Sequence, residues 1–117
     1  MRLLVCGGRN YEDDDLVSEW LNRLKPELVI TGGATGADEL AEHWCSASGV
    51  PCMVFPPAWS LHGAAAGPIR NGWMLLYGKP DRVLAFPGGR GTANMVKQAR
   101  HAGVPVTVVD EAQERDA

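Results

Sequence analysis

LVITGGATGADELAEHWCSASGVPCMVF, residues 28–55, carries the pattern from which the fold can be predicted. A short β-branched run is followed by a glycine-rich turn, by apolar residues at helical spacing, and by Gly49 and Pro51 before a second apolar run. Glycine just after a helix and proline a little further on are typical of a helix end. The stretch therefore predicts a βαβ unit, in which a right-handed helical crossover joins two parallel strands.

The same organisation continues on both sides of this stretch. Ala102-Gly103-Val104-Pro105 repeats the pattern of Ser48-Gly49-Val50-Pro51 at the end of a second such unit. Five apolar runs are predicted strands: residues 3–6, 28–31, 52–55, 82–86 and 106–109. Apolar positions at helical spacing predict helices over residues 16–24, 37–45, 69–77 and 93–102. Because the strands are continuously apolar, they are typical of parallel strands buried on both faces.

These elements predict an α/β fold with one domain. The 117 residues suit a single domain, which we place at residues 1–110, followed by a polar tail over residues 111–117. The predicted architecture is a three-layer, doubly wound parallel sheet of about five strands in the order 3-2-1-4-5. We expect Asp13 to cap the first helix, Pro26 to end it, and Gly78 to close the third before Pro80.

Composition and charge narrow the function classes. The net charge of −3, with no basic run, argues against binding of duplex nucleic acid. Cys6, Cys45 and Cys52 form no C-x-x-C pair and favour a reducing compartment. No window approaches the roughly 18 apolar residues of a membrane span, and the first apolar run is too short for a signal peptide. We expect a cytoplasmic protein without a metal site or a cofactor.

Most of the 14 glycines gather in three clusters, each directly after a predicted strand. Glycine lets the backbone approach an anion closely, and a helix N-terminus offers unpaired N–H groups. Open α/β sheets bind ligands at the carboxyl ends of their strands, so the clusters predict a phosphate site. The candidate residues in these turns are Gly7, Gly8, Arg9, Gly32, Gly33, Gly36, Pro87, Gly88, Gly89, Arg90, Gly91 and Thr92.

Two of these turns also have structural interpretations, which stay open. Thr92 suits a plain N-cap after a tight turn, as well as a hydroxyl donor to phosphate. Thr35 and Asp38 have the spacing of a capping box, in which both side chains bind backbone N–H groups at a helix start.

The long connection over residues 56–67 precedes Arg70 and Asn71 on the first turn of the third helix. A loop of this length in a small domain is usually functional. If the loop folds over the glycine turns, Arg70 and Asn71 point into the same crevice. Trp59 or Tyr11 is then a candidate for stacking on a base.

Four motifs together resemble the YspA-type branch of the SLOG superfamily. They are VCGGRNY at residues 5–11, GGA-x-GAD at 32–38, W-x-x-x-G-x-x-AGP-x-RN-x-x-M at 59–74 and FPGG-x-GT-x-x-M at 86–95. That superfamily includes the LOG phosphoribohydrolases, often labelled lysine decarboxylase-like, and the DprA proteins. The resemblance covers nearly the whole chain and implies a Rossmann-like fold with a pocket for a nucleotide or a nucleotide-derived ligand.

The resemblance implies one function first and leaves two alternatives. In LOG enzymes the P-G-G-x-G-T loop holds a 5′-phosphate, and an arginine acts with a glutamate to cleave the N-glycosidic bond. Arg70 matches that arginine, but Met95 stands at the glutamate position. We therefore expect ligand binding, for sensing or sequestering, before hydrolysis. For hydrolysis, Arg70 and Asp38 are the tentative catalytic pair, with Glu39 as an alternative to Asp38. Single-stranded nucleic-acid binding, as in DprA, comes third because the chain is acidic.

A homodimer is also expected, because the LOG and DprA relatives self-associate. Trp73 and Met74 on the third helix are the residues that we expect to support it.

Overall fold

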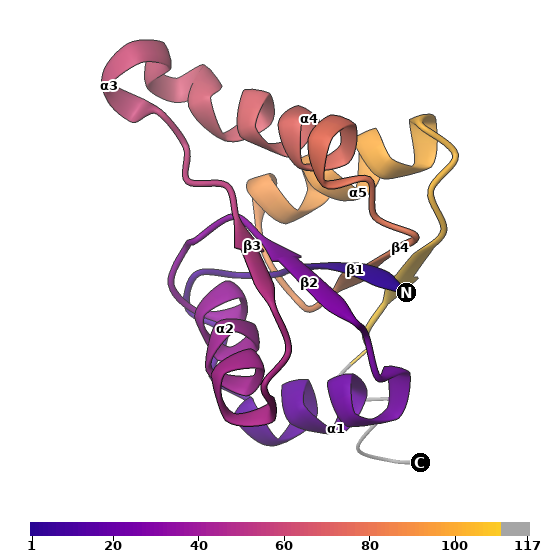
Figure 1. Ribbon diagram of the computed structural model, residues 1–117. Helices are drawn as coiled ribbons and strands as arrows, with labels where there is room; N and C mark the ends of the chain where they lie inside the picture. Colours follow the sequence, from indigo (N-terminus) through magenta and orange to yellow (C-terminus); the bar gives the residue numbers. More distant parts are fainter. Residues whose placement is uncertain (111–117) are drawn as a thin grey trace.

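The computed structural model describes residues 1–110 and contains one parallel five-stranded sheet. The strand order is β3-β2-β1-β4-β5, which confirms the predicted topology (Figure 1). The strands are β1 (Arg2–Cys6), β2 (Leu28–Thr31), β3 (Cys52–Val54), β4 (Arg82–Ala85) and β5 (Val106–Val108). The helices are α1 (Asp14–Leu24), α2 (Ala37–Ser48), α3 (Trp59–His62), α4 (Ala66–Gly78) and α5 (Arg90–His101), with a 3₁₀ turn η1 (Gly63–Ala65). The predicted tail over residues 111–117 lies outside the described residues.

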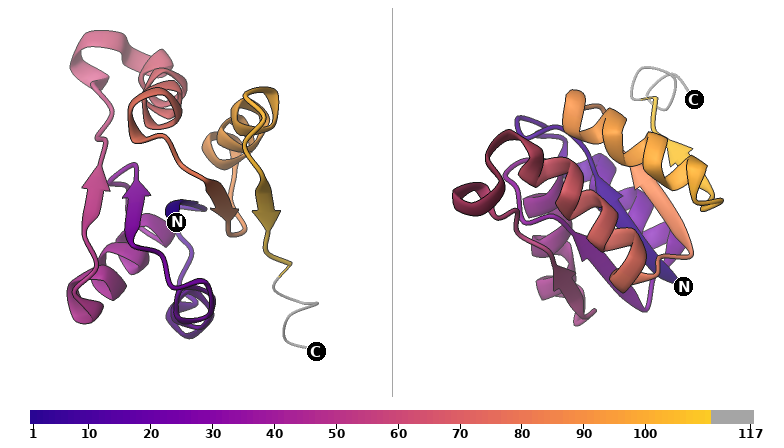
Figure 2. Two further views of the ribbon diagram at one scale, coloured as in Figure 1. Left: turned by 45° about the vertical axis from the view of Figure 1, so that its right-hand side comes forward. Right: turned by 90° about the horizontal axis from the view of Figure 1, so that it is seen from above.

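Helices cover both faces of the sheet and form three layers. Figure 2 shows α1 and α2 on one side of the strands and α4 and α5 on the other. Side chains alternate along β1: Leu3 and Val5 pack toward α1 and α2, whereas Leu4 and Cys6 pack toward α4 and α5. Each face of the central strand therefore has its own apolar core, as the continuously apolar runs predicted.

The helix ends follow the glycine and proline signals. Asp13 caps α1, since its Oδ1 accepts a hydrogen bond from the Leu16 N–H at 3.1 Å, and Gly49 ends α2 in the left-handed conformation. Gly78 closes α4 as its last residue, as predicted, and Lys79 after it adopts the left-handed conformation with φ 48°. Packing explains this glycine, because an added Cβ would lie 3.1 Å from Ile30 Cδ1.

Three strands end one residue earlier than predicted. Phe55, Phe86 and Val109 each still donate a backbone hydrogen bond to the neighbouring strand, at 2.9, 2.9 and 2.8 Å. Each of these strands nevertheless ends at the residue before. The apolar character that extended the predicted strands belongs to residues that lie just past the sheet.

The connection over residues 56–67 is not the long loop that the sequence predicted. It contains the short helix α3 and η1, which lead directly into α4 at Ala66. Neither α3 nor η1 has a buried residue, and α3 lies at the end of α4 away from the strands (Figure 1).

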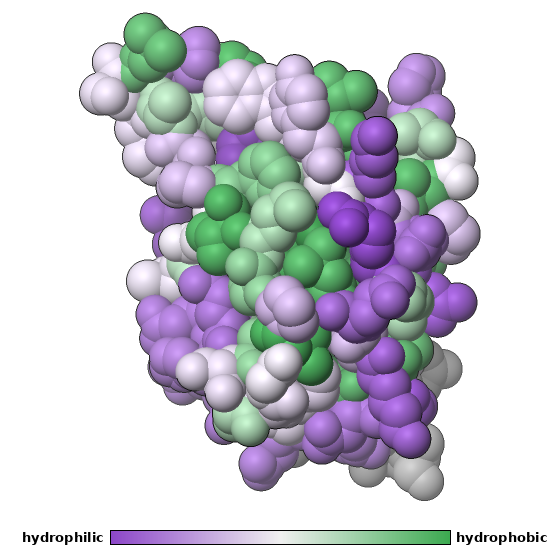
Figure 3. Space-filling model, in the orientation of Figure 1, coloured by the Kyte–Doolittle hydropathy of each residue, from purple (hydrophilic) through white to green (hydrophobic). Residues whose placement is uncertain are grey.

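Exposed apolar side chains gather on α3 and α4. The largest are Trp59, Leu61, Trp73, Leu76 and Tyr77. On the face in Figure 3, further hydrophobic surface lies between α4 and the edge strand β3. The expectation that Met74 supports a dimer is wrong, because Met74 is buried in the core, and the dimer itself stays a prediction. Within residues 1–110, no helix has both the length and the apolar character needed to cross a bilayer.

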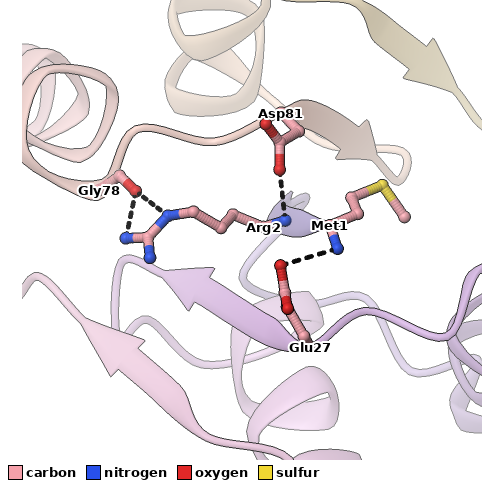
Figure 4. A network of polar contacts seen from close by, with 5 residues as sticks. All are labelled: Met1, Arg2, Glu27, Gly78 and Asp81. Atoms are coloured by element: carbon pink, nitrogen blue, oxygen red, sulfur yellow. Dashed lines mark hydrogen bonds and ion pairs between the residues drawn. The ribbon is translucent and has the colours of Figure 1, made fainter.

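Arg2 fixes the far end of α4 to the start of the central strand. Its Nε and Nη2 donate hydrogen bonds to the Gly78 carbonyl at 2.8 and 2.6 Å, and its backbone N–H donates to Asp81 Oδ2 at 2.7 Å (Figure 4). The Met1 amino group lies 3.0 Å from Glu27 Oε1. A guanidinium on the last carbonyl of a helix also stabilises the negative end of its dipole. The orientation of α4 over the sheet is thus fixed at this end.

Candidate functional site

A cleft of about 730 Å³ opens at the carboxyl ends of β1, β2 and β4. This is the point where the chain reverses its direction of travel across the sheet, since β2 and β4 lie on opposite sides of β1. Ligands of open α/β sheets bind at such a point. Predicted residues that line it are Gly7, Gly8, Arg9, Tyr11, Gly32, Asp38, Arg70, Asn71, Pro87, Gly88, Gly89, Arg90, Gly91 and Thr92.

The turns after β1 and β4 touch each other backbone to backbone. The Gly8 N–H donates a hydrogen bond to the Pro87 carbonyl at 2.9 Å. A Cβ added to Gly88 would lie 2.6 Å from the Gly8 nitrogen and would overlap Thr92 Oγ1. Only glycine permits this approach, so the two turns form one continuous wall of the cleft.

The start of α5 presents unpaired backbone donors to the cleft. Gly89 is its N-cap and makes no side-chain cap hydrogen bond. Thr92 therefore lies inside the first turn, and its interpretation as the N-cap is wrong. Within residues 1–110, the backbone N–H groups of Arg90, Gly91 and Thr92 engage no carbonyl or side chain. Unpaired N–H groups at a helix start favour an anion.

The turn after β2 differs, because two of its N–H groups already bind a carboxylate. Asp38 Oδ2 accepts hydrogen bonds from the N–H groups of Gly32 and Ala34, at 3.1 and 3.2 Å. The Thr35 hydroxyl donates to the Arg9 carbonyl at 3.0 Å. The predicted capping box is therefore wrong: Gly36 is the N-cap of α2, and the carboxylate binds the loop before it. This turn is held together by its own side chain and offers less to an anion.

Arg70 reaches from the second turn of α4 down to the end of β2. Its Nη1 donates to the Gly32 carbonyl at 2.5 Å and to the Phe55 carbonyl at 3.4 Å. A Cβ added to Gly32 would lie 2.5 Å from Arg70 Cζ, so the guanidinium occupies the space that a side chain would take. Gly32 and Arg70 are therefore complementary, although 38 positions separate them in the chain.

Asn71 is fully engaged by its neighbours. It is 3% exposed. Its Nδ2 donates to the Gly91 carbonyl at 3.2 Å and to Asn94 Oδ1 at 3.1 Å, while its Oδ1 accepts from Arg70 Nε at 3.1 Å. Asn71 thus links Arg70 to the first turn of α5. These contacts indicate a positioning residue, and its predicted ligand contact stays a prediction.

Burial sets the electrostatics at the floor of the cleft. Desolvation raises the pKa of Asp38 to about 6, against a smaller lowering by its two loop hydrogen bonds and by Arg70. Burial, with the charge of Asp38, raises the pKa of the Cys6 thiol to about 12, so this thiol stays protonated at neutral pH. Burial also lowers the pKa of Arg70. The floor therefore carries one carboxyl that titrates near neutrality and one arginine.

Three predicted residues lie elsewhere. Gly33 and Gly36 do not line the cleft, and Gly36 lines a neighbouring hollow of about 300 Å³ with Arg9 and Glu39. Gly36 has φ 77°, and an added Cβ would overlap the Gly8 carbonyl, so its glycine is explained without a ligand. Trp59 is exposed on α3 and does not line the cleft either.

Tyr11 does line the cleft, with its ring centroid 5.4 Å from that of Phe86. Stacking of a base on Tyr11 or Trp59 stays a prediction.

Sequence reasoning missed several residues of the cleft. Val5, Cys6, Asn10, Ala34 and Met74 also line it. Most of them are apolar or small and carry no signal in the sequence that distinguishes a cleft floor from a core. Met95 is fully buried in the core between the sheet and α5, so the position that holds glutamate in LOG enzymes carries no polar group here.

Two comparisons with known proteins bear on this cleft. The model of a family described as "YspA, cpYpsA-related SLOG family" matches residues 1–62, which include the first two glycine-rich turns. The chain is also similar to "Gene 61 protein" of Mycobacterium phage D29. The two are 36% identical over 117 aligned positions, which cover 90% of this chain and 93% of the relative.

Proposed function

The chain belongs to the YspA and cpYpsA-related SLOG family, as its motifs predicted, and on that premise we propose that it binds a nucleotide or a nucleotide-derived phosphorylated ligand in this cleft. Binding serves to sense or to sequester the ligand. The phosphate lies at the start of α5, against the turn over residues 87–92. The sugar and base extend toward β2.

The observation that carries this proposal is the set of unpaired N–H groups at the start of α5. Arg90, Gly91 and Thr92 all line the cleft, and their backbone N–H groups have no partner within residues 1–110. Gly89 and Gly91 have open space around them, since an added Cβ would meet no atom within 4 Å. A phosphate can therefore approach the backbone here without displacing any side chain.

A ligand screen followed by two variants tests the proposal. We expect the four common nucleoside 5′-monophosphates or ADP-ribose to raise the melting temperature by several degrees. A ligand at a concentration of 100 times its Kd adds about 2.7 kcal/mol to the free energy of unfolding. Gly91→Asp places a carboxylate where the phosphate lies and should weaken binding at least about tenfold. Isothermal titration calorimetry measures the ligand Kd of this variant and of a second one, Gly91→Ala.

Gly91→Ala is the matched control. It removes the same glycine without adding charge, and it meets no atom within 4 Å. An acidic residue in the first turn of a helix stabilises the helix, so Gly91→Asp is expected to fold at least as well as Gly91→Ala. No stabilisation by any of these ligands at millimolar concentration would refute the proposal. Equal affinities of the two variants would show that the phosphate does not bind at the start of α5.

Asp38 supports a second candidate function, N-glycosidic hydrolysis of a nucleoside 5′-monophosphate. Its carboxyl lines the cleft with a pKa raised by burial to about 6, which suits proton transfer near neutral pH. The C1′–N bond breaks, a water oxygen bonds to C1′, and the water's protons end on the released base and the sugar hydroxyl. Asp38 accepts a proton from the water, and Arg70 holds the substrate.

Release of free base from each monophosphate, followed by chromatography, distinguishes the two functions. If Asp38 is the base, Asp38→Asn should lower the rate by about 10² to 10⁴, with the fold unchanged by circular dichroism. If a monophosphate binds and no base is released, the protein binds the ligand without hydrolysing it. Release that survives in Asp38→Asn would exclude Asp38 as the base.

A further inference from the structure

The two oxygens of Asp38 have different surroundings. Oδ2 accepts both loop hydrogen bonds, from Gly32 and Ala34. Within residues 1–110, Oδ1 takes part in no hydrogen bond. It is also not one of the fully buried polar atoms without a partner in this part of the chain, so some of its surface is exposed. Since Asp38 is 6% exposed and lines the cleft, its small exposed surface belongs to the cleft side. Oδ1 is therefore an acceptor that opens into the cleft.

No charged neighbour uses this oxygen. Within residues 1–110, no ion pair or hydrogen bond joins Asp38 to Arg70, whose guanidinium donates to Gly32, Phe55 and Asn71 instead. The other titratable groups whose charges act on Asp38, or on which its charge acts, are Glu42 on its own helix, Cys6 on β1 and Cys52 on β3. None of them supplies a hydrogen-bond donor to Oδ1.

Retaining a carboxylate here has a cost in stability. Burial raises the pKa of Asp38 above its ordinary value, so the folded protein binds more protons than the unfolded chain between about pH 4 and 6, and stability falls as the pH rises through that range. Above pH 6 the ionised carboxylate makes the fold less stable than a neutral group of the same shape would. A residue kept at such a cost points to a role in function.

The two ends of the cleft differ in charge and suit different parts of a ligand. The end at α5 offers N–H groups and Arg90, whereas the end at β2 offers a carboxylate oxygen. The strand β1 lies between them, and two strand spacings amount to about 10 Å. A second phosphate at the β2 end would meet the charge of Asp38. A hydroxyl or amino group there would donate a hydrogen bond to it.

We propose that Asp38 Oδ1 binds the nucleoside part of the ligand, by accepting a hydrogen bond from a sugar hydroxyl or an exocyclic amino group. The inference rests on the proposed function and adds the chemical class of the ligand group that binds at the β2 end, a neutral hydrogen-bond donor. It predicts that the ligand is a nucleoside phosphate with a neutral donor remote from its phosphate, rather than an inorganic or a fully phosphorylated anion.

Asp38→Asn tests this assignment without disturbing the loop. The asparagine carbonyl oxygen can accept the hydrogen bonds of Gly32 and Ala34, as Oδ2 does. Its amide nitrogen then replaces Oδ1 and presents donors where the carboxylate presented an acceptor. The variant also loses the buried charge, so it is expected to melt no lower than the native protein above about pH 6.

Calorimetric titration of the full chain with adenosine 5′-monophosphate and with inorganic phosphate, near pH 7.5, gives the decisive comparison. Asp38→Asn should raise Kd for the monophosphate by about 10- to 100-fold, because a charge-assisted hydrogen bond is lost. Kd for inorganic phosphate should change by less than about threefold. Asp15→Asn, the same change at an exposed site on α1, is the control and should change neither value.

Two analogues identify the donor. The 2′,3′-dideoxy monophosphate lacks the sugar hydroxyls, and purine riboside 5′-monophosphate lacks the amino group. The analogue without the donor should bind the native protein weakly and should bind Asp38→Asn equally weakly. Lowering the pH to 5 should weaken monophosphate binding to the native protein more than to Asp38→Asn, because only the native protein then protonates residue 38.

The outcomes separate this inference from the proposed function. If no common nucleoside monophosphate binds the native protein, both fail. If the monophosphate binds and Asp38→Asn binds it equally well, the inference alone is overturned. Equal losses for the monophosphate and for inorganic phosphate in Asp38→Asn would also overturn it, because they would show that Asp38 acts by shaping the cleft.

Discussion

Gly88→Ala is expected to lower the free energy of unfolding by about 3 kcal/mol, and the melting temperature by on the order of 10 °C. The added Cβ would lie 2.6 Å from the Gly8 nitrogen and 2.9 Å from the Gly7 carbonyl carbon. Both are backbone atoms held in place by the hydrogen bond from Gly8 to Pro87. The turns must therefore separate, which also removes the wall of the cleft. Thermal unfolding followed by circular dichroism measures the effect.

Gly89→Ala provides the matched control one position along the chain. An added Cβ at Gly89 would meet nothing within 4 Å, so the free energy of unfolding should stay within about 0.5 kcal/mol of the native value. Similar melting temperatures for the two variants would show that the turns after β1 and β4 are not in contact.

Arg70→Ala is expected to weaken binding of adenosine 5′-monophosphate by about 100-fold near pH 7.5. The substitution removes a positive charge that acts on Asp38, and hydrogen bonds to charged groups contribute about 1.5–3 kcal/mol each. It also leaves the Gly32 and Phe55 carbonyls without their guanidinium donor. Without Arg70 the pKa of Asp38 rises further, so less carboxylate is present at neutral pH. Calorimetric titration measures the loss of affinity, and a melting curve shows whether the fold is also destabilised.

Gly32→Ala separates the charge of Arg70 from its position. The added Cβ would displace the guanidinium but would leave the arginine in the chain. We expect a loss of affinity in the same direction as for Arg70→Ala, but only about tenfold. If Arg70→Ala instead lowers the melting temperature and binds as tightly as the native protein, Arg70 serves the fold and not the ligand.

Local signals in the sequence were sufficient to predict most of the fold. Gly49 and Gly103 adopt positive φ where helices end, and the apolar runs lie in the buried sheet. Because crossovers between parallel strands are right-handed, few sheet topologies then remained possible. The segment over residues 59–65 was predicted as loop because its short helix has no capping side chain and buries no residue. Neither signal that identifies a helix was therefore present.

The site was predicted in part, because only some of its contacts are local. The glycine-rich turns lie next to strands, so their place at one edge followed from the topology. The engagement of the β2 turn by Asp38 and the fit of Arg70 over Gly32 depend on distances that no spacing in the sequence encodes. For that reason the sequence predicted anion binding at all three turns, whereas in the structure Asp38 already binds two N–H groups of the β2 turn. At the start of α5, the N–H groups of Arg90, Gly91 and Thr92 are unpaired within residues 1–110.

The segment formed by α3 and η1 contributes no buried residue. Its local unfolding uncovers little apolar surface and so requires far less free energy than global unfolding. Opening stops at α4, because Arg2 holds one end of that helix and Gln98, whose amide donates to the Pro68 carbonyl at 3.0 Å, holds the other. Residues 59–65 can thus exchange between conformations many times during the lifetime of one folded molecule, while the cleft, which none of them lines, keeps its shape.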